Sequence, residues 1–501
     1  MSAESGTATL GNSSPDASNP PTSGFVSDAS IKLGWTSSIV SLDPATITTA
    51  ASYHLLYSIY DRLLSLEPGT MTLAPGLATE WGFEGENNLL FRMKLRQGVT
   101  FQDGEPFNAQ AVKTSLERFF PLGLLVPIKH VTEVEVVGDY EVVLHLSEPT
   151  SDLPYTLADV GGMIVSPKSI QTDPDGIATK PVGAGRYRAV SVEPGSKVVL
   201  ERFDKYWNFN GAAPARVEWD YYRDSISMVN AMKSGSLDGL INPVFADVST
   251  LQKTSGFQVT IAPRLSWRGF YLNASVEPTK NPDVRRALNM ALDRDELMQL
   301  ATEGQGFVTS QPYPEGHAAH IAGLDYKYDP DQAKSLLAGA GYSNGFKLDC
   351  ITLGAAALPP TLIPTLTSQL SKVGIDVNFR DLAPSEGVTE FFAVDGPPCL
   401  LSGWAGQIST YTTLHSLFGS DGSYNAGKTD FGVDADLGEL AATVDADAQA
   451  EIAQRIIQKT FDSAGAAIMY GDPAVIMLRD GISMDPIGLL YPDFSSLVMK
   501  Q

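Results

Sequence analysis

The sequence has little basic charge for its length, few cysteines and no long apolar segment. Its 501 residues include 35 lysines and arginines against 58 aspartates and glutamates, which gives a formal net charge of -23. Such an acidic surface repels phosphate backbones and anionic lipid headgroups, so it argues against binding to nucleic acid or to a membrane surface. No apolar run reaches the roughly 18–20 residues of a membrane-spanning helix. The chain is too long for one ordinary core, so we expect two or three soluble domains.

Two cysteines, Cys350 and Cys399, are too few for a disulfide framework. Both lie in segments that we expect to be strands of a single lobe. Two buried thiols are the simpler interpretation. The alternative is one disulfide bond, which would require an oxidising compartment.

Motifs for catalysis and for cofactor binding are also missing. There is no G-x-S-x-G elbow, and the Gly-Ala-Gly at 183–185 precedes an expected strand, whereas a dinucleotide-binding loop must open a helix. PEGHAAH contains Glu315, His317 and His320 but no H-E-x-x-H pattern and no third fixed ligand, which favours a polar loop over a metal site. From these absences we predict a protein that is not an enzyme, has no cofactor and holds no metal.

One stretch, GSYNAGKT at 422–429, does match a phosphate-binding P-loop letter for letter. A working P-loop joins a buried strand to a helix N-terminus, where backbone N–H groups hold the phosphates. The preceding residues 417–421 are not a β-branched strand, and 430–434 place two acids and a glycine where the helix should start. The Asp-Phe-Gly at 430–432 has no kinase catalytic loop with it. We therefore predict a surface loop whose glycines allow a turn.

The first residues differ in kind from the rest. The segment 1–26 is dominated by small and polar residues, with Leu10 the only large apolar side chain from Ser2 to Gly24. It cannot bury enough surface to order itself, so we expect a flexible tether. No charged and apolar signal segment precedes it, so the protein is either cytosolic or a chain from which a signal was removed. A polar tether suits a domain that its first residue holds away from a membrane.

The folded part divides into a β-rich first half and an α/β second half. A strand at 31–33 and a helix at 52–66 are followed by period-2 alternation at 89–96 and by hairpins around Gly138 and Gly195. Three helices have N-terminal caps in the sequence, at Asn108, Asn281 and Asp329. Further on, strands at 346–352, 375–379 and 399–402 alternate with helices at 361–373 and 385–392, the pattern of a doubly wound βαβαβ lobe.

Five stretches together resemble the extracellular solute-binding proteins of peptide-, nickel- and opine-type ABC importers, called family 5. They are SLDPATITTAASYHLLYSIYDRLLSLEPGTMTLAPGLATEW, LRQGVTFQDGEPFNAQAVKTSLERF, PVGAGRYRAVSVEPGSKVVLERFDKYWN, NPDVRRALNMALDRDEL and YDPDQAKSLLAGAGY. They occur in the order of the family and span 41–342. The likeness continues more weakly to the C-terminus.

The resemblance implies an α/β protein of the periplasmic-binding-protein type II fold, with two hinged lobes and an extra β-rich domain. Domain I would be discontinuous and comprise 27–66, 181–268 and 472–501. Domain II, the β-rich one, would be 67–180, and domain III, the α/β lobe, would be 269–471. The breaks that we placed from composition and periodicity fall in similar positions.

The resemblance also implies how the protein acts. The two lobes of such proteins close around a solute, and contacts from the solute to both lobes stabilise the closed form. The closed form then docks on a membrane permease whose separate subunits hydrolyse ATP. We expect a monomer that lies outside the cytoplasm and is lipid-anchored in its native form, with Met1 standing where such mature chains carry a lipidated cysteine.

Candidate ligand-binding residues follow from the loops between the lobes. They are Trp35, Ser37 and Ser38 after the first strand, Arg264 and Trp267 at the crossing into the third domain, Tyr313, and Trp404, Gln407, Tyr411 and His415 in SGWAGQISTYTTLHSLF. Core packing is the alternative for each aromatic side chain, and a solvated charge is the alternative for Arg264. His415 could contact a ligand, contact a metal as in nickel-binding relatives, or simply be solvated.

Gln407 is where this sequence departs from the family. The similar motif in peptide-binding relatives is Gly-Trp-x-x-Asp, whose aspartate binds the α-ammonium group of the peptide. In this sequence the motif begins at Gly403 and Trp404, and Gln407 takes the place of the aspartate. A neutral amide cannot neutralise that buried charge. The departure argues against ordinary dipeptides and favours longer peptides held by their backbone, or a non-peptide organic solute. A nickel or metal-chelate carrier and a secreted peptide-holding chaperone are the alternatives.

Overall fold

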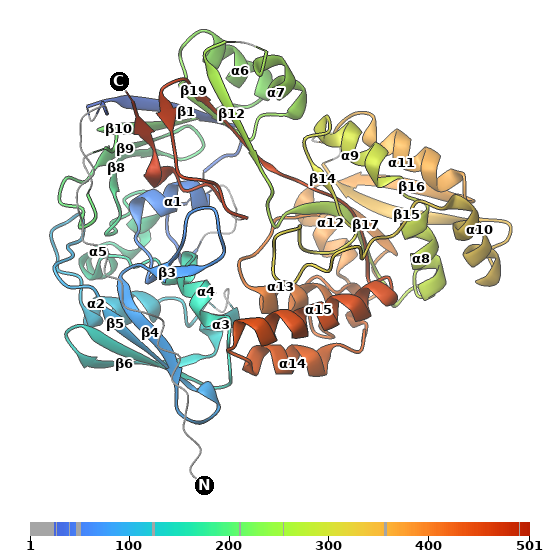
Figure 1. The fold of residues 1–501 in the computed structure, drawn as a ribbon, viewed down its shortest axis with the longest axis horizontal. Helices are drawn as coiled ribbons and strands as arrows, with labels where there is room; N and C mark the ends of the chain where they lie inside the picture. Colours follow the sequence, from blue (N-terminus) through green and yellow to red (C-terminus); the bar gives the residue numbers. More distant parts are fainter. Residues whose placement is uncertain are drawn as a thin grey trace.

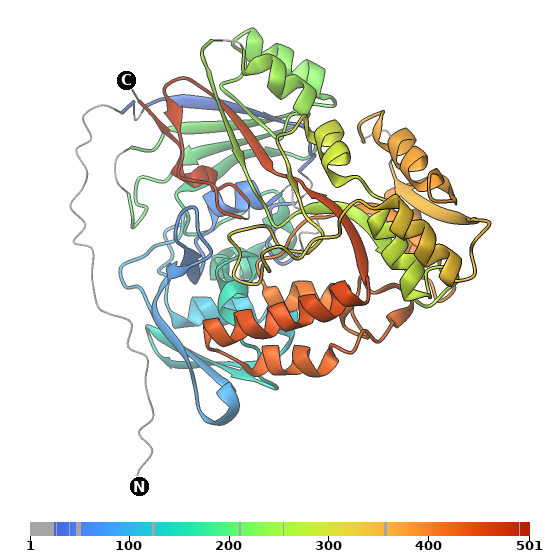
Figure 2. The ribbon, with the colours of Figure 1, turned by 45° about the vertical axis from the view of Figure 1, so that its right-hand side comes forward.

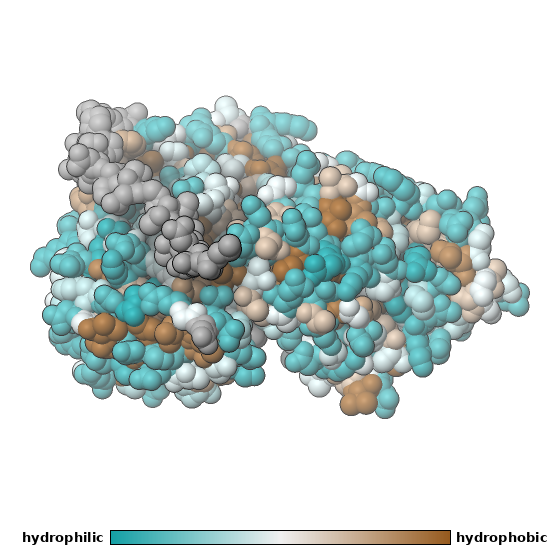
Figure 3. All heavy atoms as spheres, turned by 60° about the horizontal axis from the view of Figure 1, so that its bottom comes forward, coloured by the Kyte–Doolittle hydropathy of each residue, from teal (hydrophilic) through white to brown (hydrophobic). Residues whose placement is uncertain are grey.

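In the computed structural model, the chain forms two lobes, each built around its own main sheet (Figure 1). The structure describes residues 25–26, 28–39, 41–46, 52–122, 126–209, 212–253, 255–354, 358–489 and 491–500. The predicted tether lies almost wholly outside these residues. Figure 3 shows the molecule turned so that the bottom of Figure 1 comes forward. On this face the surface is mostly hydrophilic with scattered apolar patches, and a notch separates the lobes.

The main sheet of the larger lobe has seven strands, collected from distant parts of the chain. In spatial order they are β12 (Phe257–Ala262), β19 (Ala474–Arg479), β11 (Gly239–Ile241), β1 (Ser30–Trp35), β10 (Arg216–Tyr221), β9 (Lys197–Arg202) and β8 (Tyr187–Glu193). The first strand is central and parallel to both neighbours, with Leu33 opposite Trp219 and Gly239. Helices α1 (Tyr53–Ile59), α6 (Ser225–Lys233) and α7 (Phe245–Leu251) belong to this lobe.

A smaller antiparallel sheet lies beside it in the same lobe. Its order is β4 (Ala78–Glu84), β5 (Leu90–Leu95), β7 (Glu141–Leu146) and β6 (Val131–Gly138). Both the alternation at 89–96 and the hairpin around Gly138 are confirmed. The accompanying helices are α2 (Ala109–Leu116), α3 (Val126–Lys129), α4 (Leu153–Leu157) and α5 (Pro167–Thr172). Asn108 caps α2 by accepting a hydrogen bond from the backbone N–H of Ala111 at 3.0 Å.

The second lobe is the expected α/β lobe. Its sheet runs β14 (Phe307–Val308), β18 (Ala466–Gly471), β13 (Trp267–Leu272), β17 (Cys399–Trp404), β15 (Phe346–Leu353) and β16 (Ile375–Leu382). The parallel order β17–β15–β16 confirms the βαβαβ prediction. Its helices are α8 (Pro282–Met290), α9 (Arg294–Thr302), α10 (Pro330–Gly339), α11 (Leu362–Ser371), α12 (Pro384–Phe391), α13 (Thr410–Phe418), α14 (Asp434–Ala442) and α15 (Ala446–Asp462). Asn281 and Asp329 cap α8 and α10 as predicted.

The main chain crosses between the two sheets at two adjacent places. The strand β12 leads through Arg264 into β13, and β18 leads through Asp472 into β19. Figures 1 and 2 show these segments running side by side from one lobe to the other. Two neighbouring crossings are the arrangement of a hinge. The division into domains I, II and III remains a prediction, which the membership of the three sheets supports.

One local expectation was wrong. The helix predicted over 52–66 ends at Ile59, because Tyr60 is extended and its hydroxyl donates to the carbonyl of Leu42 at 3.2 Å. The chain then forms a small hairpin, β2 (Leu64–Leu66) with β3 (Leu73–Pro75). A second small pair, β20 (Ile482–Ser483) and β21 (Val498–Met499), lies near the C-terminus.

Cys350 and Cys399 form a disulfide bond, so the interpretation as two buried thiols was wrong and the alternative is confirmed. The two residues are register partners on the adjacent parallel strands β15 and β17. Sequence spacing could not show this pairing, because the two strands become neighbours only in the folded sheet.

Candidate functional site

Three of the predicted tryptophans lie at the ends of strands near the crossing. Trp35 ends β1, Trp267 begins β13 and Trp404 ends β17, and the last two are register partners in the second sheet. All three side chains are buried. The sheets therefore bring aromatic residues of both lobes to the region where the chain passes between them.

In the larger lobe, Trp35 belongs to an aromatic cluster. Its ring lies 4.9 Å from His54 and 6.2 Å from Trp219, between ring centroids. His54 lies 5.5 Å from Tyr491, and Tyr491 stacks on Tyr53 at 4.9 Å. His54, Tyr53 and Tyr491 were not predicted from the sequence, although the first two stand in the stretch ASYHLLY, which is part of the resemblance to the family.

In the second lobe, Trp267 and Trp404 stack on each other with centroids 6.4 Å apart. Tyr424 packs edge-on against Trp404 at 5.1 Å, and Tyr271 lies 5.3 Å from Trp267. Tyr424 belongs to GSYNAGKT, so this loop supports the aromatic cluster.

The two clusters meet across the lobes. The hydroxyl of Tyr491 donates to the carbonyl of Ala405, next to Trp404, at 3.5 Å, and the N–H of Leu265 donates to the carbonyl of Leu489 at 2.8 Å. Arg264 lies next to Leu265 on one crossing segment, and its Nε donates to the carbonyl of Asp472 on the other crossing segment at 3.2 Å. The candidate site thus has an aromatic cluster in each lobe and two guanidiniums at the crossing, those of Arg264 and of Arg268, which pairs with Asp472 at 3.7 Å.

Unpaired donors distinguish these tryptophans from ordinary core residues. Within the described part of the chain, the indole N–H groups of Trp219, Trp267 and Trp404 are buried without a hydrogen-bond partner. A buried donor without a partner costs about 1–3 kcal/mol. A solute that presents oxygen acceptors would remove part of this cost.

Arg264 acts electrostatically on both neighbours. Burial lowers the pKa of His54 to about 3, and the positive charge of Arg264 contributes in the same direction. Burial raises the pKa of Tyr491 to about 12, and Arg264 opposes that rise. His54 is therefore neutral near pH 7, and the positive charge that acts on it is that of Arg264.

Gln407 and Tyr411 flank the start of α13. Gln407 is half-buried and follows Gly406, whose positive φ of 82° and close approach to Leu265 leave no room for a side chain. Tyr411 stacks on His415 at 5.3 Å, and burial raises the pKa of its hydroxyl to about 12. His415 pairs with Asp421 at 2.8 Å.

The remaining predicted residues are Ser37, Ser38 and Tyr313. Ser37 lines a small depression beside Trp35, and Ser38 lies near Gly195 in the turn between β8 and β9. Tyr313 is buried, stacks on His317 at 4.1 Å and donates to the carbonyl of Thr410 at 3.2 Å. Its contacts are those of a packed core residue.

A second contact between the lobes was missed by the sequence argument. Asp152, just before α4, is only 4% exposed, and its carboxylate accepts hydrogen bonds from the hydroxyls of Ser409 and of Thr412, the latter at 3.2 Å. Next to it, Ser151 donates through its N–H to Ala441 and through its hydroxyl to Leu440, both at 2.8 Å. We call Ser151, Asp152, Ser409 and Thr412 the interlobe latch.

GSYNAGKT has none of the surroundings of a P-loop. It follows the helix α13 rather than a strand, and α14 begins only at Asp434. The ammonium group of Lys428 donates to the carbonyls of Gly422 at 2.6 Å and Asp421 at 3.2 Å. Asn425 is buried, so the loop is partly internal rather than wholly at the surface.

PEGHAAH forms no metal centre among the described residues, where no group of three potential ligands occurs. His320 contacts the carbonyl of Tyr313 through Nδ1 at 3.0 Å. Burial lowers the pKa of His317 to about 4. Both histidines therefore have structural contacts.

The protein has two lobes, each built around its own sheet. Two adjacent crossings join the lobes, and contacts of aromatic residues connect them. This arrangement defines a solute-binding protein of the periplasmic type II fold. The family model for bacterial extracellular solute-binding proteins, family 5 Middle, matches residues 72–425. The chain belongs to this family, the solute-binding components of ABC importers. In the described part, no helix is long and apolar enough to cross a bilayer.

Individual relatives agree with this assignment. The glutathione-binding protein GsiB of Pectobacterium atrosepticum is 28% identical over 367 residues, which cover 72% of this chain and 71% of that protein. DppA of Helicobacter pylori, solved with the peptide STSA, has a TM-score of 0.81 at 21% identity over 95% of this chain and 99% of its own. NikA of Brucella suis, solved with Fe(III)-EDTA, has a TM-score of 0.84 at 21% identity over 94% of this chain and 100% of its own. GsiB and DppA are binding proteins, and the structural likeness confirms the type II fold.

The buried neutral His54 predicts a pH dependence of stability. Its pKa is about 3 in the fold, below the ordinary value of 6.5, so the unfolded chain binds more protons below pH 6.5. Between pH 7 and pH 5 this group should lower the free energy of unfolding by about 2 kcal/mol. Urea unfolding at pH 7 and pH 5 measures this effect. Between these pH values, the free energy of unfolding of a His54→Phe variant should fall by about 2 kcal/mol less than that of the parent protein.

His145→Phe is the matched control, since His145 is partly exposed on β7 and contacts Glu135 at 2.8 Å. The pKa of Asp61 is raised to about 6, so its protonation below pH 6 stabilises the fold and opposes the effect of His54. This contribution is the same in every variant. An equal pH dependence in His54→Phe and in the parent protein would contradict the prediction.

Proposed function

We propose that this protein captures a peptide-class or other organic solute between its lobes outside the cytoplasm and delivers it to an ABC permease. The observation that carries the proposal is the meeting of two aromatic clusters, with unpaired indole donors, beside Arg264 at the crossing. In this proposal the solute contacts Trp35, Arg264, Trp267, Trp404 and Gln407, with Tyr491 and His54 as further walls.

The chemistry of the region favours a solute with oxygen acceptors and at least one carboxylate. Indole N–H groups only donate, and a guanidinium pairs with carboxylates in a planar, bidentate manner. The likeness to a glutathione-binding protein and to a binding protein solved with the peptide STSA supports a short peptide. The NikA likeness keeps a metal chelate as the second candidate, in which the carboxylates of the chelator, not protein ligands, would hold the metal.

The finer biological setting is part of the same proposal. We infer a monomer that is anchored by a lipid in its native form. The Cys350–Cys399 disulfide supports an oxidising compartment, because such bonds are rare in the cytosol.

Native mass spectrometry of the purified protein, followed by thermal unfolding with a solute panel, tests the function. The panel is glutathione, di- to tetrapeptides, Ni(L-His), Fe(III)-EDTA and MgATP. A solute at 100 times its Kd should stabilise the fold by about 2.7 kcal/mol, whereas MgATP should have no effect. Stabilisation by MgATP alone, with no co-purified solute, would contradict the proposal.

Gln407 should set the preference at the ammonium end of a peptide. Gln407→Asp should strengthen binding of dipeptides with a free N-terminus at least tenfold, because it supplies the missing negative charge. Gln407→Asn is the control, since it has the same length as aspartate without the charge. Isothermal titration with a dipeptide and its N-acetylated form measures the effect. Equal affinities for the Asp and Asn variants would remove Gln407 from the site.

A further inference from the structure

A cavity of about 450 Å³ lies within the larger lobe, next to the aromatic meeting point. Its walls come from the end of α1, the hairpin β2–β3, the segment 206–208 and the C-terminal segment 485–496. Tyr57 and Tyr491 line it, and Tyr491 is also the residue that reaches across to Ala405. The volume is in the range of ligand pockets.

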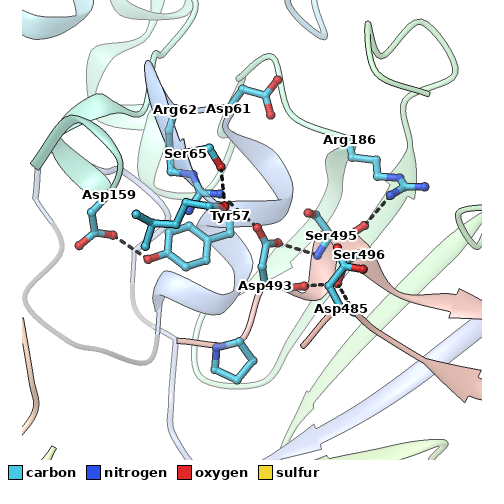
Figure 4. A network of polar contacts seen from close by, with 12 residues as sticks. Tyr57, Asp61, Arg62, Ser65, Asp159, Arg186, Asp485, Asp493, Ser495 and Ser496 are labelled. Atoms are coloured by element: carbon cyan, nitrogen blue, oxygen red, sulfur yellow. Dashed lines mark hydrogen bonds and ion pairs between the residues drawn. The ribbon is translucent and has the colours of Figure 1, made fainter. Parts of the chain in front are cut away.

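Most charged groups of the cavity already have partners in the fold. Arg62 pairs with Asp493 at 3.2 Å, and Asp493 also accepts from the N–H of Ser495 at 3.0 Å. Arg186 donates to the carbonyl of Ser495 at 3.1 Å. Figure 4 shows these groups linked in one network of polar contacts. These groups hold the C-terminal segment against α1.

Asp61 differs from them. Its carboxylate accepts hydrogen bonds from two neutral donors, the hydroxyl of Tyr206 at 3.1 Å and the indole N–H of Trp207. Among the described residues it forms no ion pair, and Figure 4 shows no contact between it and the other labelled groups. Burial raises the pKa of Asp61 to about 6, although the hydrogen bonds from Trp207 and Tyr206 and the positive charge of Arg62 oppose the rise. A cation beside Asp61 would compensate this charge.

The rest of the lining also favours a cation. It contains four carboxylates, those of Asp61, Glu67, Asp485 and Asp493, against two guanidiniums, those of Arg62 and Arg186. Two aromatic rings of the lining each contact a guanidinium group. Arg62 lies 4.3 Å from the ring centroid of Tyr57, and Arg96 lies 4.0 Å from the ring centroid of Trp207. A primary ammonium group suits such walls, because it donates three hydrogen bonds and is attracted to aromatic faces.

The geometry points to a binding site for a primary ammonium group in this cavity, with Asp61 as its counter-ion. The ammonium belongs either to a free amine or to a cationic arm of the transported solute that passes Tyr491. The second source rests on the proposed function, whereas the ammonium site itself does not.

Amine binding to the full chain tests the site. The probes are n-pentylamine and 1-pentanol, which share their apolar chain and differ in charge, and the readout is isothermal titration at pH 7.5. The parent protein should bind the amine at least tenfold more tightly than the alcohol, and Asp61→Asn should abolish this difference. Asp139→Asn, an exposed aspartate in the same lobe, is the control and should retain it.

A second variant guards against misfolding of Asp61→Asn. Asp485→Asn changes an exposed residue of the cavity rim and should weaken amine binding two- to fivefold with unchanged circular dichroism. Amine affinities that are equal in the parent protein, Asp61→Asn and Asp485→Asn would overturn the site, whatever solute binds between the lobes.

Paired tripeptides separate the two sources of the ammonium. Gly-Gly-Lys and Gly-Gly-norleucine differ only at the end of one side chain. A preference for lysine that disappears in Asp61→Asn assigns the site to an arm of the solute. Amine binding with equal tripeptide affinities overturns the solute arm and leaves a site for free amines. If neither tripeptide binds but n-pentylamine does, the peptide-class function fails and the ammonium site stands.

Discussion

Asp152→Ala should shift the protein toward an open arrangement of its lobes. In the structure, this buried carboxylate accepts hydrogen bonds from the hydroxyls of Ser409 and Thr412 across the lobes. Removing it leaves both hydroxyls without their acceptor, at a cost of about 1–3 kcal/mol. A change of about 2 kcal/mol lowers the ratio of closed to open protein by about 30-fold.

Small-angle X-ray scattering measures the opening, because separated lobes raise the radius of gyration. Solute affinity should fall with the closed fraction, since only the closed form offers contacts from both lobes. Asp152→Asn should have a smaller effect than alanine, because the amide oxygen still accepts a hydrogen bond. Asp139→Ala, in the exposed turn between β6 and β7, is the matched control. Scattering and affinity equal to those of the parent protein would show that the latch does not hold the lobes together.

Reduction of the Cys350–Cys399 disulfide should lower the free energy of unfolding of the second lobe by about 4 kcal/mol. The two cysteines are 49 residues apart, and closing a loop of this length restricts the unfolded chain by about that amount. The bond joins neighbouring strands of the sheet that carries Trp267 and Trp404, so its loss should also loosen the lobe at the site.

Urea unfolding with and without a phosphine reductant, followed by the tryptophan fluorescence of this lobe, measures the effect. A Cys350→Ala, Cys399→Ala double variant should match the reduced protein and should not respond to reductant. A parent protein whose unfolding midpoint is the same in both conditions would contradict the prediction.

Local features were predictable because their causes are local. Asn108, Asn281 and Asp329 were predicted as caps, and each accepts a hydrogen bond from a backbone N–H within three residues. The period-2 alternation at 89–96 likewise became a strand because one face meets a core. The end of α1 was mispredicted because its cause is distant: Tyr60 is fixed by the carbonyl of Leu42, 18 residues away.

The candidate site divides in the same way. Trp35, Trp267 and Trp404 could be proposed from strand ends and from the resemblance, and the sheets bring them to the crossing. Tyr491 and Asp152 could not, because their partners Ala405 and Ser409 lie 86 and 257 residues away. No period or motif encodes a contact at such a separation.

The sequence by itself determined the family, the α/β and β-rich segments, the lack of catalytic motifs and the neutral amide at Gln407. Only the tertiary structure decided that Cys350 pairs with Cys399, that Arg264 bonds to the second crossing segment at Asp472, and that the carboxylate of Asp61 lines a cavity and accepts hydrogen bonds from neutral donors. The reason is physical. Periodicity and capping act over a few residues, whereas burial, pairing and charge compensation depend on which distant segments the fold packs together.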